Sequence, residues 1–280
     1  MILICDSGST KADWVLTDGK KILSEFQTEG LNPVHLSAEF IASELGPVKE
    51  TLSEYGDADE IFFFGAGCGA GEGKERIRHV LTKTFPGSMI TVDNDLMAAA
   101  LAASGKKKGI ISILGTGSNC CYYDGITLHL KNFGLGYILG DEASGAWFGK
   151  KLLRAFLYEK LPENLQTAFL TEYQLTREKI IDAVYRKQKA NLFLSSFMPF
   201  IAAYKEDAFI KELLMSGLGE FFNSNILAFE EAGNIPVHFV GSVAALLETE
   251  IRETGKISGV RIGKILKRPM DGLKEYFLTK

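Results

Sequence analysis

The sequence is poor in the residues that build disulfides and metal centres. It has four cysteines and four histidines in 280 residues. Cys5, Cys68, Cys120 and Cys121 form no CxxC pair, and three of the four lie in or beside strand-forming stretches. The histidines are scattered singly. We therefore expect reduced, buried thiols, and the pattern argues against a histidine-based metal site.

Long apolar runs and an excess of positive charge are missing as well. No apolar run approaches the ~18 residues of a membrane span, and Asp6 interrupts the first strand too early for a signal peptide. The formal net charge of -4 at pH 7 gives no basic field that would attract a nucleic acid. We expect a cytoplasmic protein with neither a nucleic-acid nor a membrane partner.

The chain is instead rich in apolar residues, which make up 46% of its 280 positions. That length and content suffice for two domains with their own cores. Residues 1–106 read as three strands followed by helix, strand, helix, strand and helix, an order consistent with a ribonuclease-H-like domain. Residues 107–280 begin again with three strands and contain a helical insertion at about 146–232. The terminal helix, 271–280, could pack on the first domain.

Three apolar strands end in short corners of glycine and hydroxyl residues. The corners are Asp6-Ser7-Gly8-Ser9-Thr10-Lys11, Gly115-Thr116-Gly117-Ser118-Asn119 and Gly241-Ser242-Val243. Glycine permits backbone conformations that turn successive N–H groups toward one anion. Each corner alone also fits an ordinary β-turn. Together they predict an α/β fold, with two ribonuclease-H-like domains and a nucleotide cleft between them.

The acidic and amide residues beside these corners each have two interpretations. Within Asp93-Asn94-Asp95 one residue can cap the helix that begins near Leu96, and another could accept a proton from an attacking hydroxyl in phosphoryl transfer. Asp6 could form a turn or hold Mg²⁺ through water. Asp141 could cap the next helix or bind a polar ligand, and Asn32 could form a turn or bind a sugar hydroxyl.

Taken in chain order, these motifs resemble those of the BadF/BadG/BcrA/BcrD ATPase family. Within that family they are most similar to N-acetylglucosamine kinases, members of the sugar kinase, heat-shock chaperone and actin superfamily. The resemblance spans nearly the whole chain. The motifs that carry it are Asp6 to Lys11, Asn94-Asp95, Leu114 to Asn119, Gly140-Asp141-Glu142-Ala143-Ser144 and Val240 to Val243. It implies ATP-dependent phosphorylation of an amino sugar, N-acetylglucosamine at its C6 hydroxyl.

The resemblance also implies a role for single residues. Asp95 falls at the position of the general base, and Asp6 at one that holds Mg²⁺ through water. The residues that the resemblance assigns to ATP are Asp6, Gly8, Ser9, Thr10, Lys11, Gly115, Thr116, Gly117, Ala203, Gly241 and Ser242. Those that it assigns to the sugar are Asn32, Ser118, Asn119, Gly134, Leu135 and Asp141.

Two positions depart from the family pattern. Val34 and Leu135 stand where the animal enzymes carry tryptophan, so the sugar, like the phosphoryl donor, stays open. The aromatic helices of residues 146–232 could form their own core or bury a homodimer interface. Two other functions stay in view. One is a non-catalytic sugar-binding module. The other is an ATPase switch like the family's dehydratase activators, although the cysteines do not resemble the iron–sulfur ligands of those proteins.

Overall fold

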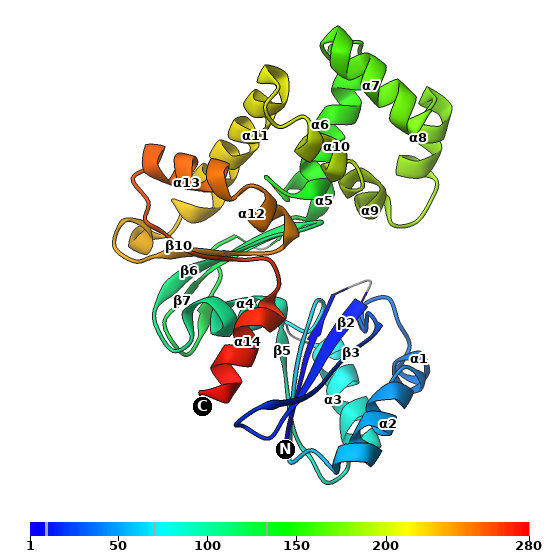
Figure 1. Ribbon diagram of the computed structural model, residues 1–280, viewed down its shortest axis with the longest axis vertical. Coiled ribbons are helices and arrows are strands. Elements are labelled where there is room, and N and C mark those ends of the chain that lie inside the picture. The colour runs from blue at the N-terminus through cyan, green and yellow to red at the C-terminus, as the bar shows by residue number, and fades with distance from the viewer. Residues whose placement is uncertain (9–10, 70, 133, 280) are drawn as a thin grey trace. The chain divides into compact units, whose positions relative to one another are not determined.

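The computed structural model describes residues 1–8, 11–69, 71–132 and 134–279, which fold into two compact units (Figure 1). The first unit comprises Met1–Lys106 and Arg268–Lys280, and the second comprises Lys107–Lys267. The second domain thus ends at Lys267 and not at residue 280. The reason is that α14 (Pro269–Leu278) packs on α4 (Asp95–Ser104) of the first unit.

The first unit is built on a five-stranded mixed sheet. Its strands are β1 (Ile2–Ser7), β2 (Lys11–Thr17), β3 (Ile22–Glu29), β4 (Glu60–Gly65) and β5 (Met89–Asn94), in the order β3-β2-β1-β4-β5. The first three pair antiparallel, and β4 and β5 are parallel to β1. Helices α1 (Ala38–Ser43), α2 (Gly46–Tyr55) and α3 (Glu72–Thr84) lie together on one side of this sheet (Figure 1).

The strand register places Asp6 and Asp13 on one face of this sheet and the core residues Cys5 and Trp14 on the other. Cys5 pairs with Trp14, and both belong to the core that also contains residues of α1, α2 and α3. Because successive strand residues alternate between faces, the adjacent pair, Asp6 and Asp13, projects from the other face. That face is contacted by α4 and α14, and Phe62 of β4 meets Phe277 of α14 there.

Local signals in the sequence explain where the helices of the first unit begin. The Ser37 hydroxyl caps α1 by accepting a hydrogen bond from the backbone N–H of Phe40. Gly46-Pro47 divides the helical stretch expected to start at Ser37: α1 ends at Ser43 and α2 begins at Gly46. Proline fits the first turn of a helix, whose N–H groups have no partner within the helix.

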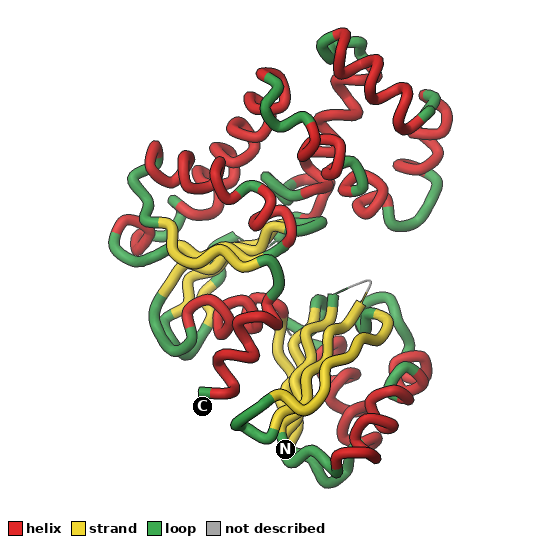
Figure 2. The backbone as a smooth tube through the Cα atoms, viewed as in Figure 1, coloured by secondary structure: helices red, strands yellow, loops and turns green. Residues whose placement is uncertain are grey.

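The second unit repeats the topology of the first. Strands β6 (Gly109–Leu114), β7 (Ser118–Tyr123), β8 (Leu128–His129), β9 (Val237–Val240) and β10 (Ile262–Leu266) form a sheet of order β10-β9-β6-β7-β8. Counted by strand, both sheets read third, second, first, fourth, fifth in one direction, which confirms the predicted α/β repeat (Figure 2). Two strands differ from expectation: β8 has two residues only, and β10 begins at Ile262 where the sequence suggested an end.

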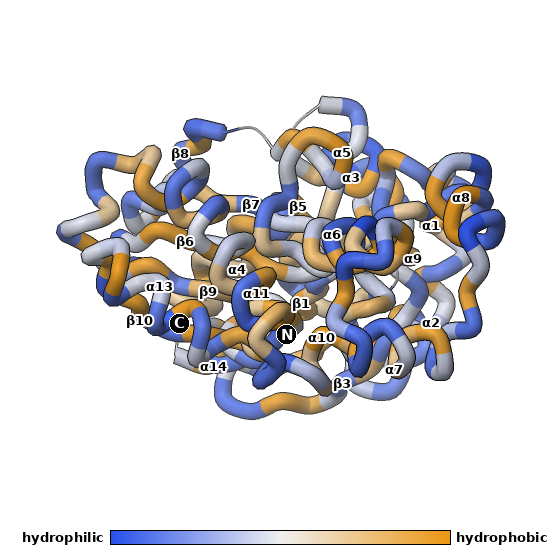
Figure 3. The backbone as a smooth tube through the Cα atoms, turned by 90° about the horizontal axis from the view of Figure 1, so that it is seen from above, coloured by the Kyte–Doolittle hydropathy of each residue, from blue (hydrophilic) through white to orange (hydrophobic). Residues whose placement is uncertain are grey.

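A helical block separates β8 from β9, as the sequence predicted. Its helices are α5 (Gly136–Leu139), α6 (Gly145–Leu157), α7 (Glu163–Tyr173), α8 (Arg177–Tyr185), α9 (Ala190–Ser195), α10 (Met198–Ala203), α11 (Ala208–Phe221), a π-helical turn (Phe222–Ile226) and a 3-10 turn (Glu230–Gly233). Hydrophobic and hydrophilic residues alternate along them (Figure 3). Two further helices, α12 (Ser242–Leu246) and α13 (Glu248–Ile257), follow β9.

The aromatic residues of this block fill the core of the second unit. The ring of Phe169 lies 4.6 Å from that of Phe156, 5.5 Å from that of Phe197 and 5.2 Å from that of Phe200. All four side chains are buried. None of the described helices combines the length and the apolar character needed to cross a membrane.

Candidate functional site

Two aspartates stand together at the end of the first strand. Asp6 of β1 pairs with Asp13 of β2 in the antiparallel register. Residues that are directly paired in this way project from the same face of a sheet, so the two carboxylates are neighbours. Lys11 lies 3.3 Å from Asp13 and brings a positive charge to the group. Two carboxylates and one ammonium group therefore lie at the strand end that the family resemblance assigns to ATP and Mg²⁺.

The N-cap of α4 is Asn94 and not Asp95. The Asn94 side chain accepts a hydrogen bond from the N–H of Met97 at 2.9 Å. Asp93 accepts one from the N–H of Asn94 at 2.9 Å, and Asp95 accepts one from the N–H of Leu96 at 3.0 Å. Of the two interpretations of this tripeptide, capping therefore belongs to Asn94. The Asp95 carboxylate is not needed to begin the helix.

The negative charge of Asp95 acts on the carboxylate of Asp6. Burial, followed by the negative charges of Asp95 and Asp13, raises the pKa of Asp6 to about 7, against an opposing effect of Lys11. Burial also raises the pKa of Asp95, against the hydrogen bond from Leu96. The shift of Asp95 follows from poor solvation, and that of Asp6 from poor solvation together with its acidic neighbours.

This electrostatic setting fits a divalent cation, which would supply the positive charge that the carboxylates lack. No group of three acidic, histidine or cysteine side chains in the described part of the chain is arranged to hold a metal ion by itself. A cation bound here would therefore keep water ligands, as Mg²⁺ commonly does. The donor set thus agrees with a Mg²⁺ ion that Asp6 contacts through water.

The loop after β3 fixes Asn32 against a glycine of the loop after β4. Asn32 is 8% exposed, and its Oδ1 accepts a hydrogen bond from the N–H of Val34 at 3.0 Å. A Cβ on Gly67 would lie 2.6 Å from that oxygen, and Gly67 has a φ of +80°. Only glycine satisfies both conditions. The glycine-rich exit of β4 therefore makes room for the Asn32 loop, as the sequence suggested it would for a ligand or another segment.

Two further side chains hold the Asn32 loop in place. The Ser7 hydroxyl at the end of β1 accepts a hydrogen bond from the N–H of Leu31 at 2.8 Å. From α3, the Arg76 guanidinium donates hydrogen bonds to the carbonyls of Pro33 and Leu36. Charged donors to carbonyls are among the stronger hydrogen bonds in proteins. The position of Asn32 is thus tied both to the strand that carries Asp6 and to a helix.

In the second unit, the Gly115-Thr116-Gly117 turn lies on the N-terminus of α6. The turn is closed by a hydrogen bond from the N–H of Gly115 to the carbonyl of Gly117 at 2.9 Å. The N–H of Gly145 donates to the Gly115 carbonyl at 2.8 Å, and that of Ala146 to the Thr116 carbonyl at 3.0 Å. The first turn of α6 therefore holds this loop. Its capping residue is Ser144 and not Asp141.

Asp141 lies directly over this turn. A Cβ on Gly117 would be 2.9 Å from Oδ2 of Asp141, and the backbone N–H of Ser118 donates a hydrogen bond to the same carboxylate. Burial raises the pKa of Asp141. Asp141 and Ala143 have φ values of 57° and 58°, a left-handed conformation that is uncommon for residues with a side chain. Such strain tends to persist where a functional side chain must be aimed.

The third glycine corner, at Gly241, packs against the residue that precedes the same loop. Gly241 has a φ of +127°, and a Cβ there would lie 2.2 Å from the carbonyl oxygen of Leu114, the residue before Gly115. The N–H of Gly241 donates to the carbonyl of Leu266 at 2.9 Å. The structure therefore brings together three motifs that are far apart in the sequence: Gly115 to Ser118, Asp141, and Gly241 with Ser242.

The remaining residues assigned from the sequence are placed as follows. Asn119 and Gly134 are neighbours, since a Cβ on Gly134 would lie 3.9 Å from Nδ2 of Asn119. Leu135 is 62% exposed and Val34 is 65% exposed. Ala203 is the last residue of α10 and is exposed.

The first corner is described only in part. The N–H of Gly8 donates to the carbonyl of Lys11 at 3.0 Å, so the chain reverses tightly between β1 and β2. Ser9 and Thr10, both assigned to ATP, lie outside the described residues.

Sequence reasoning missed Asp13 and Arg76. Asp13 could have been found, because antiparallel pairing of the first two apolar strands in the observed register places Asp13 opposite Asp6. The sequence holds no comparable signal for Arg76, whose hydrogen bonds to Pro33 and Leu36 span 43 and 40 residues.

Comparisons with known proteins agree with the motifs. A crystal structure of a Porphyromonas gingivalis protein that bears the provisional name N-acetylglucosamine kinase is 38% identical, covers 100% of this chain and 99% of its own, and superimposes with a TM-score of 0.94. A protein from Chromobacterium violaceum with the same provisional name shares the fold, at 18% identity, 99% and 98% coverage and a TM-score of 0.78.

A curated relative from Clostridium acetobutylicum is named N-acetylmuramic acid/N-acetylglucosamine kinase. It is 30% identical over 193 residues, which are 66% of this chain and 62% of that protein. The match thus spans less than two thirds of the relative. No protein-family model matches the chain. The resemblance to N-acetylglucosamine kinases drawn from the motifs is confirmed by these relatives.

Proposed function

Because the chain belongs to the N-acetylglucosamine kinase family of sugar kinases, we propose that it transfers the γ-phosphoryl group of ATP to the C6 hydroxyl of an N-acetylated hexosamine, N-acetylglucosamine in the first place. The observation that carries this proposal is the Asp95 carboxylate. It is partly buried, its pKa is raised, and Asn94 has taken over the cap that would otherwise explain it.

In the proposed reaction Asp95 is the general base. A sugar hydroxyl is too weakly acidic to attack well on its own, and a carboxylate within hydrogen-bonding distance can accept its proton as the bond to phosphorus forms. The hydroxyl oxygen then bonds to the γ-phosphorus, the bond to the β-phosphate oxygen breaks, and ADP leaves with that electron pair. The raised pKa suits this role, since it makes the carboxylate a better proton acceptor.

The phosphate-binding residues come from both units. Gly115, Thr116 and Gly117 would hold the ATP phosphates through backbone N–H groups and the Thr116 hydroxyl, together with the first corner, Asp6 to Lys11. Gly241, Ser242 and Ala203 would contact the adenosine. Asp6 would hold Mg²⁺ through water. The bound ion would neutralise negative charge on the phosphate oxygens.

The sugar-binding residues form two groups. Asn32 in the first unit is rigidly held by its loop. In the second unit Asn119 and Gly134 are neighbours, and Asp141 is fixed over Gly117 beside Ser118. Amide side chains donate and accept hydrogen bonds with sugar hydroxyls, and carboxylates accept them. We propose that these residues bind the sugar, and that Val34 and Leu135, both exposed, take less space beside it than tryptophan would.

The experiment that tests this function is an ADP-release assay across a panel of sugars. N-acetylglucosamine, N-acetylmuramic acid, N-acetylmannosamine, glucosamine and glucose should be compared at equal concentration with Mg²⁺ and ATP. We expect stimulation by N-acetylated hexosamines, with N-acetylglucosamine among the best. Hydrolysis of ATP that no sugar accelerates would instead favour the ATPase switch.

The cysteines do not support the alternative function of an ATPase switch. Cys5, Cys68, Cys120 and Cys121 are all buried, and burial raises the pKa of the Cys5 thiol and brings those of Cys68 and Cys120 to about 12. A cluster shared between two subunits needs thiolates that are accessible at a surface. The ATPase switch therefore lacks its ligands in this fold.

A further inference from the structure

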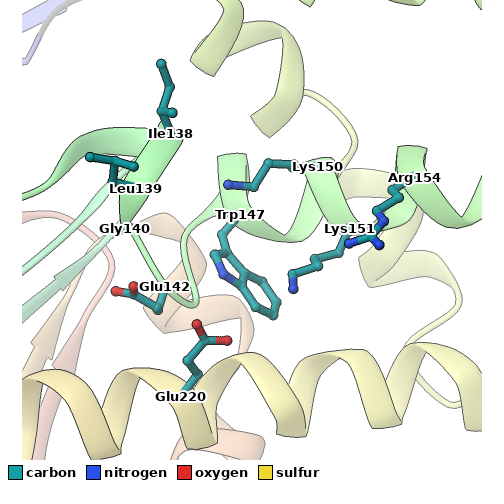
Figure 4. Close-up of a pocket in the computed structure, with 9 residues that line it drawn as sticks. All are labelled: Ile138, Leu139, Gly140, Glu142, Trp147, Lys150, Lys151, Arg154 and Glu220. Atoms are coloured by element: carbon teal, nitrogen blue, oxygen red, sulfur yellow. The ribbon is translucent and has the colours of Figure 1, made fainter.

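One face of α6 presents an indole and three cations to an open cavity. Trp147, Lys150, Lys151 and Arg154 are spaced by three, one and three residues, which places them on the same side of the helix. They line a cavity of about 270 Å³ together with Ile138, Leu139, Gly140, Glu142 and Glu220 (Figure 4). A second cavity, of about 420 Å³, also begins at Lys151 and Arg154.

The charges around the first cavity are separated by sign. In Figure 4, Glu142 and Glu220 lie toward one end, Lys151 and Arg154 toward the other, and Trp147 lies between them. None of these four charged side chains, nor Lys150, forms an ion pair within the described part of the chain, where the pairs of the second unit involve other residues. Acidic and basic side chains that line one cavity without pairing with each other can bind the two opposite charges of a single ligand.

Several contacts hold these side chains in position. The Lys151 ammonium lies 4.6 Å from the centre of the Trp147 ring, a favourable cation–π distance. Lys150 donates a hydrogen bond to the carbonyl of Tyr137 at 2.9 Å, and Glu142 accepts one from Asn225 at 3.3 Å. Burial, followed by the charge of Lys151, lowers the pKa of Lys150.

We propose that this cavity binds a phosphorylated hexosamine with a free amino group. The two cations at one end, Lys151 and Arg154, match the charge of about -1.5 to -2 that a phosphate monoester carries at pH 7 better than they match one carboxylate, which disfavours an amino acid. Arginine binds phosphate oxygens in pairs. Glu142 and Glu220 would receive the ammonium group at the other end.

The chemistry of this ligand places it one reaction after the proposed product. An N-acetylhexosamine phosphate carries the phosphate but has an uncharged amide. Hydrolysis of that amide releases acetate and leaves the ammonium that Glu142 and Glu220 require. Gly140 and Glu142, which line the cavity, flank Asp141, which we assign to the sugar. One turn of the chain would therefore contact both ligands. The choice of a hexosamine and this last consequence rest on the proposed function, whereas binding of a ligand with a phosphate and an ammonium group does not.

Calorimetric titration of the purified full chain with glucosamine 6-phosphate tests the proposal. It should be run with excess N-acetylglucosamine, so that the sugar site is blocked. We expect binding that is about tenfold weaker in the Lys151→Ala/Arg154→Ala variant, because charge-assisted hydrogen bonds are lost. The matched control is Arg177→Ala/Lys179→Ala on α8, which removes the same charges from exposed positions and should bind like wild type.

A second variant tests the acidic end. Wild type should prefer glucosamine 6-phosphate to glucose 6-phosphate, N-acetylglucosamine 6-phosphate and inorganic phosphate. Glu220→Gln should keep phosphate binding and lose that preference. The proposal is overturned if glucosamine 6-phosphate does not bind, if both variants bind it like wild type, if N-acetylglucosamine displaces it, or if a free amino acid binds more tightly. Failure of the sugar-kinase assay would leave these binding results intact.

Discussion

The three residues after Val92 differ in role: one caps the helix, and another is the proposed general base. Asn94 begins the helix, Asp93 supports Asn94, and Asp95 follows with a carboxylate of raised pKa. The sequence alone left capping and proton acceptance equally open here. The hydrogen bonds assign the cap, whereas the role of base stays a proposal.

Replacing Asp95 by asparagine should lower kcat by about 10²- to 10⁴-fold, the usual contribution of a general base. The side chain keeps its size and can still accept the hydrogen bond from Leu96. Asp93→Asn is the control, because it removes an equal charge two residues away and should retain turnover near that of wild type. Steady-state kinetics with N-acetylglucosamine measure both. Nearly full turnover by Asp95→Asn would show that another group takes the proton.

Asp6 should make the ligand-free protein less stable as the pH rises. Its pKa is about 7 in the folded chain, against 3.8 for an unperturbed side chain. Between these values the folded state holds a proton that the unfolded state has lost, so the free energy of unfolding falls with increasing pH. The full effect is up to about 4 kcal/mol. It is absent below about pH 4 and complete above about pH 7.

The Asp6→Asn variant removes this penalty. In urea unfolding from about pH 4 to about pH 8, wild type should lose stability relative to Asp6→Asn as the pH rises, and the two should converge at the acidic end. Asp57→Asn, at an exposed position, should follow wild type throughout. Parallel curves for wild type and Asp6→Asn would mean that the Asp6 carboxylate is better solvated than its surroundings suggest.

At the scale of elements, α3 positions the sugar-binding loop through Arg76. Arg76→Ala removes both hydrogen bonds to the carbonyls of Pro33 and Leu36. We expect the KM for sugar to rise about tenfold, in proportion to the loss of one or two charge-assisted hydrogen bonds, while kcat changes little. Arg78→Ala on the same helix is the control, since Arg78 only approaches Glu75 at 3.7 Å. A fall in kcat with an unchanged KM would contradict this positioning role.

Two helical glycines should respond oppositely to alanine. A Cβ on Gly219 of α11 would extend into open space, so Gly219→Ala should stabilise the fold by about 0.5–1 kcal/mol. In α14, a Cβ on Gly272 would lie 2.4 Å from the carbonyl oxygen of Ala102 in α4. Gly272→Ala should therefore destabilise the fold by about 1–3 kcal/mol. Urea unfolding compares the two, and equal stabilisation would mean that α14 does not pack tightly on α4.

For the whole molecule, the order of elements was predictable and their spatial neighbours were largely not. Apolar strands separated by helical periodicity predicted both repeats. The contact of Gly241 with Leu114 joins residues more than a hundred positions apart, and no local pattern encodes it. The packing of the terminal helix on the first domain was among the expectations, and small residues such as Ala102 and Gly272 allow α14 and α4 to approach closely.

The central claim is that this chain phosphorylates an amino sugar and does not merely hydrolyse ATP. The most direct measurement is ³¹P–¹H correlation NMR on a reaction of the purified protein with ATP, Mg²⁺ and N-acetylglucosamine. The account predicts a new phosphomonoester resonance correlated with the two C6 protons, formed in step with ADP. Formation of ADP with inorganic phosphate alone, or no consumption of ATP, would contradict it.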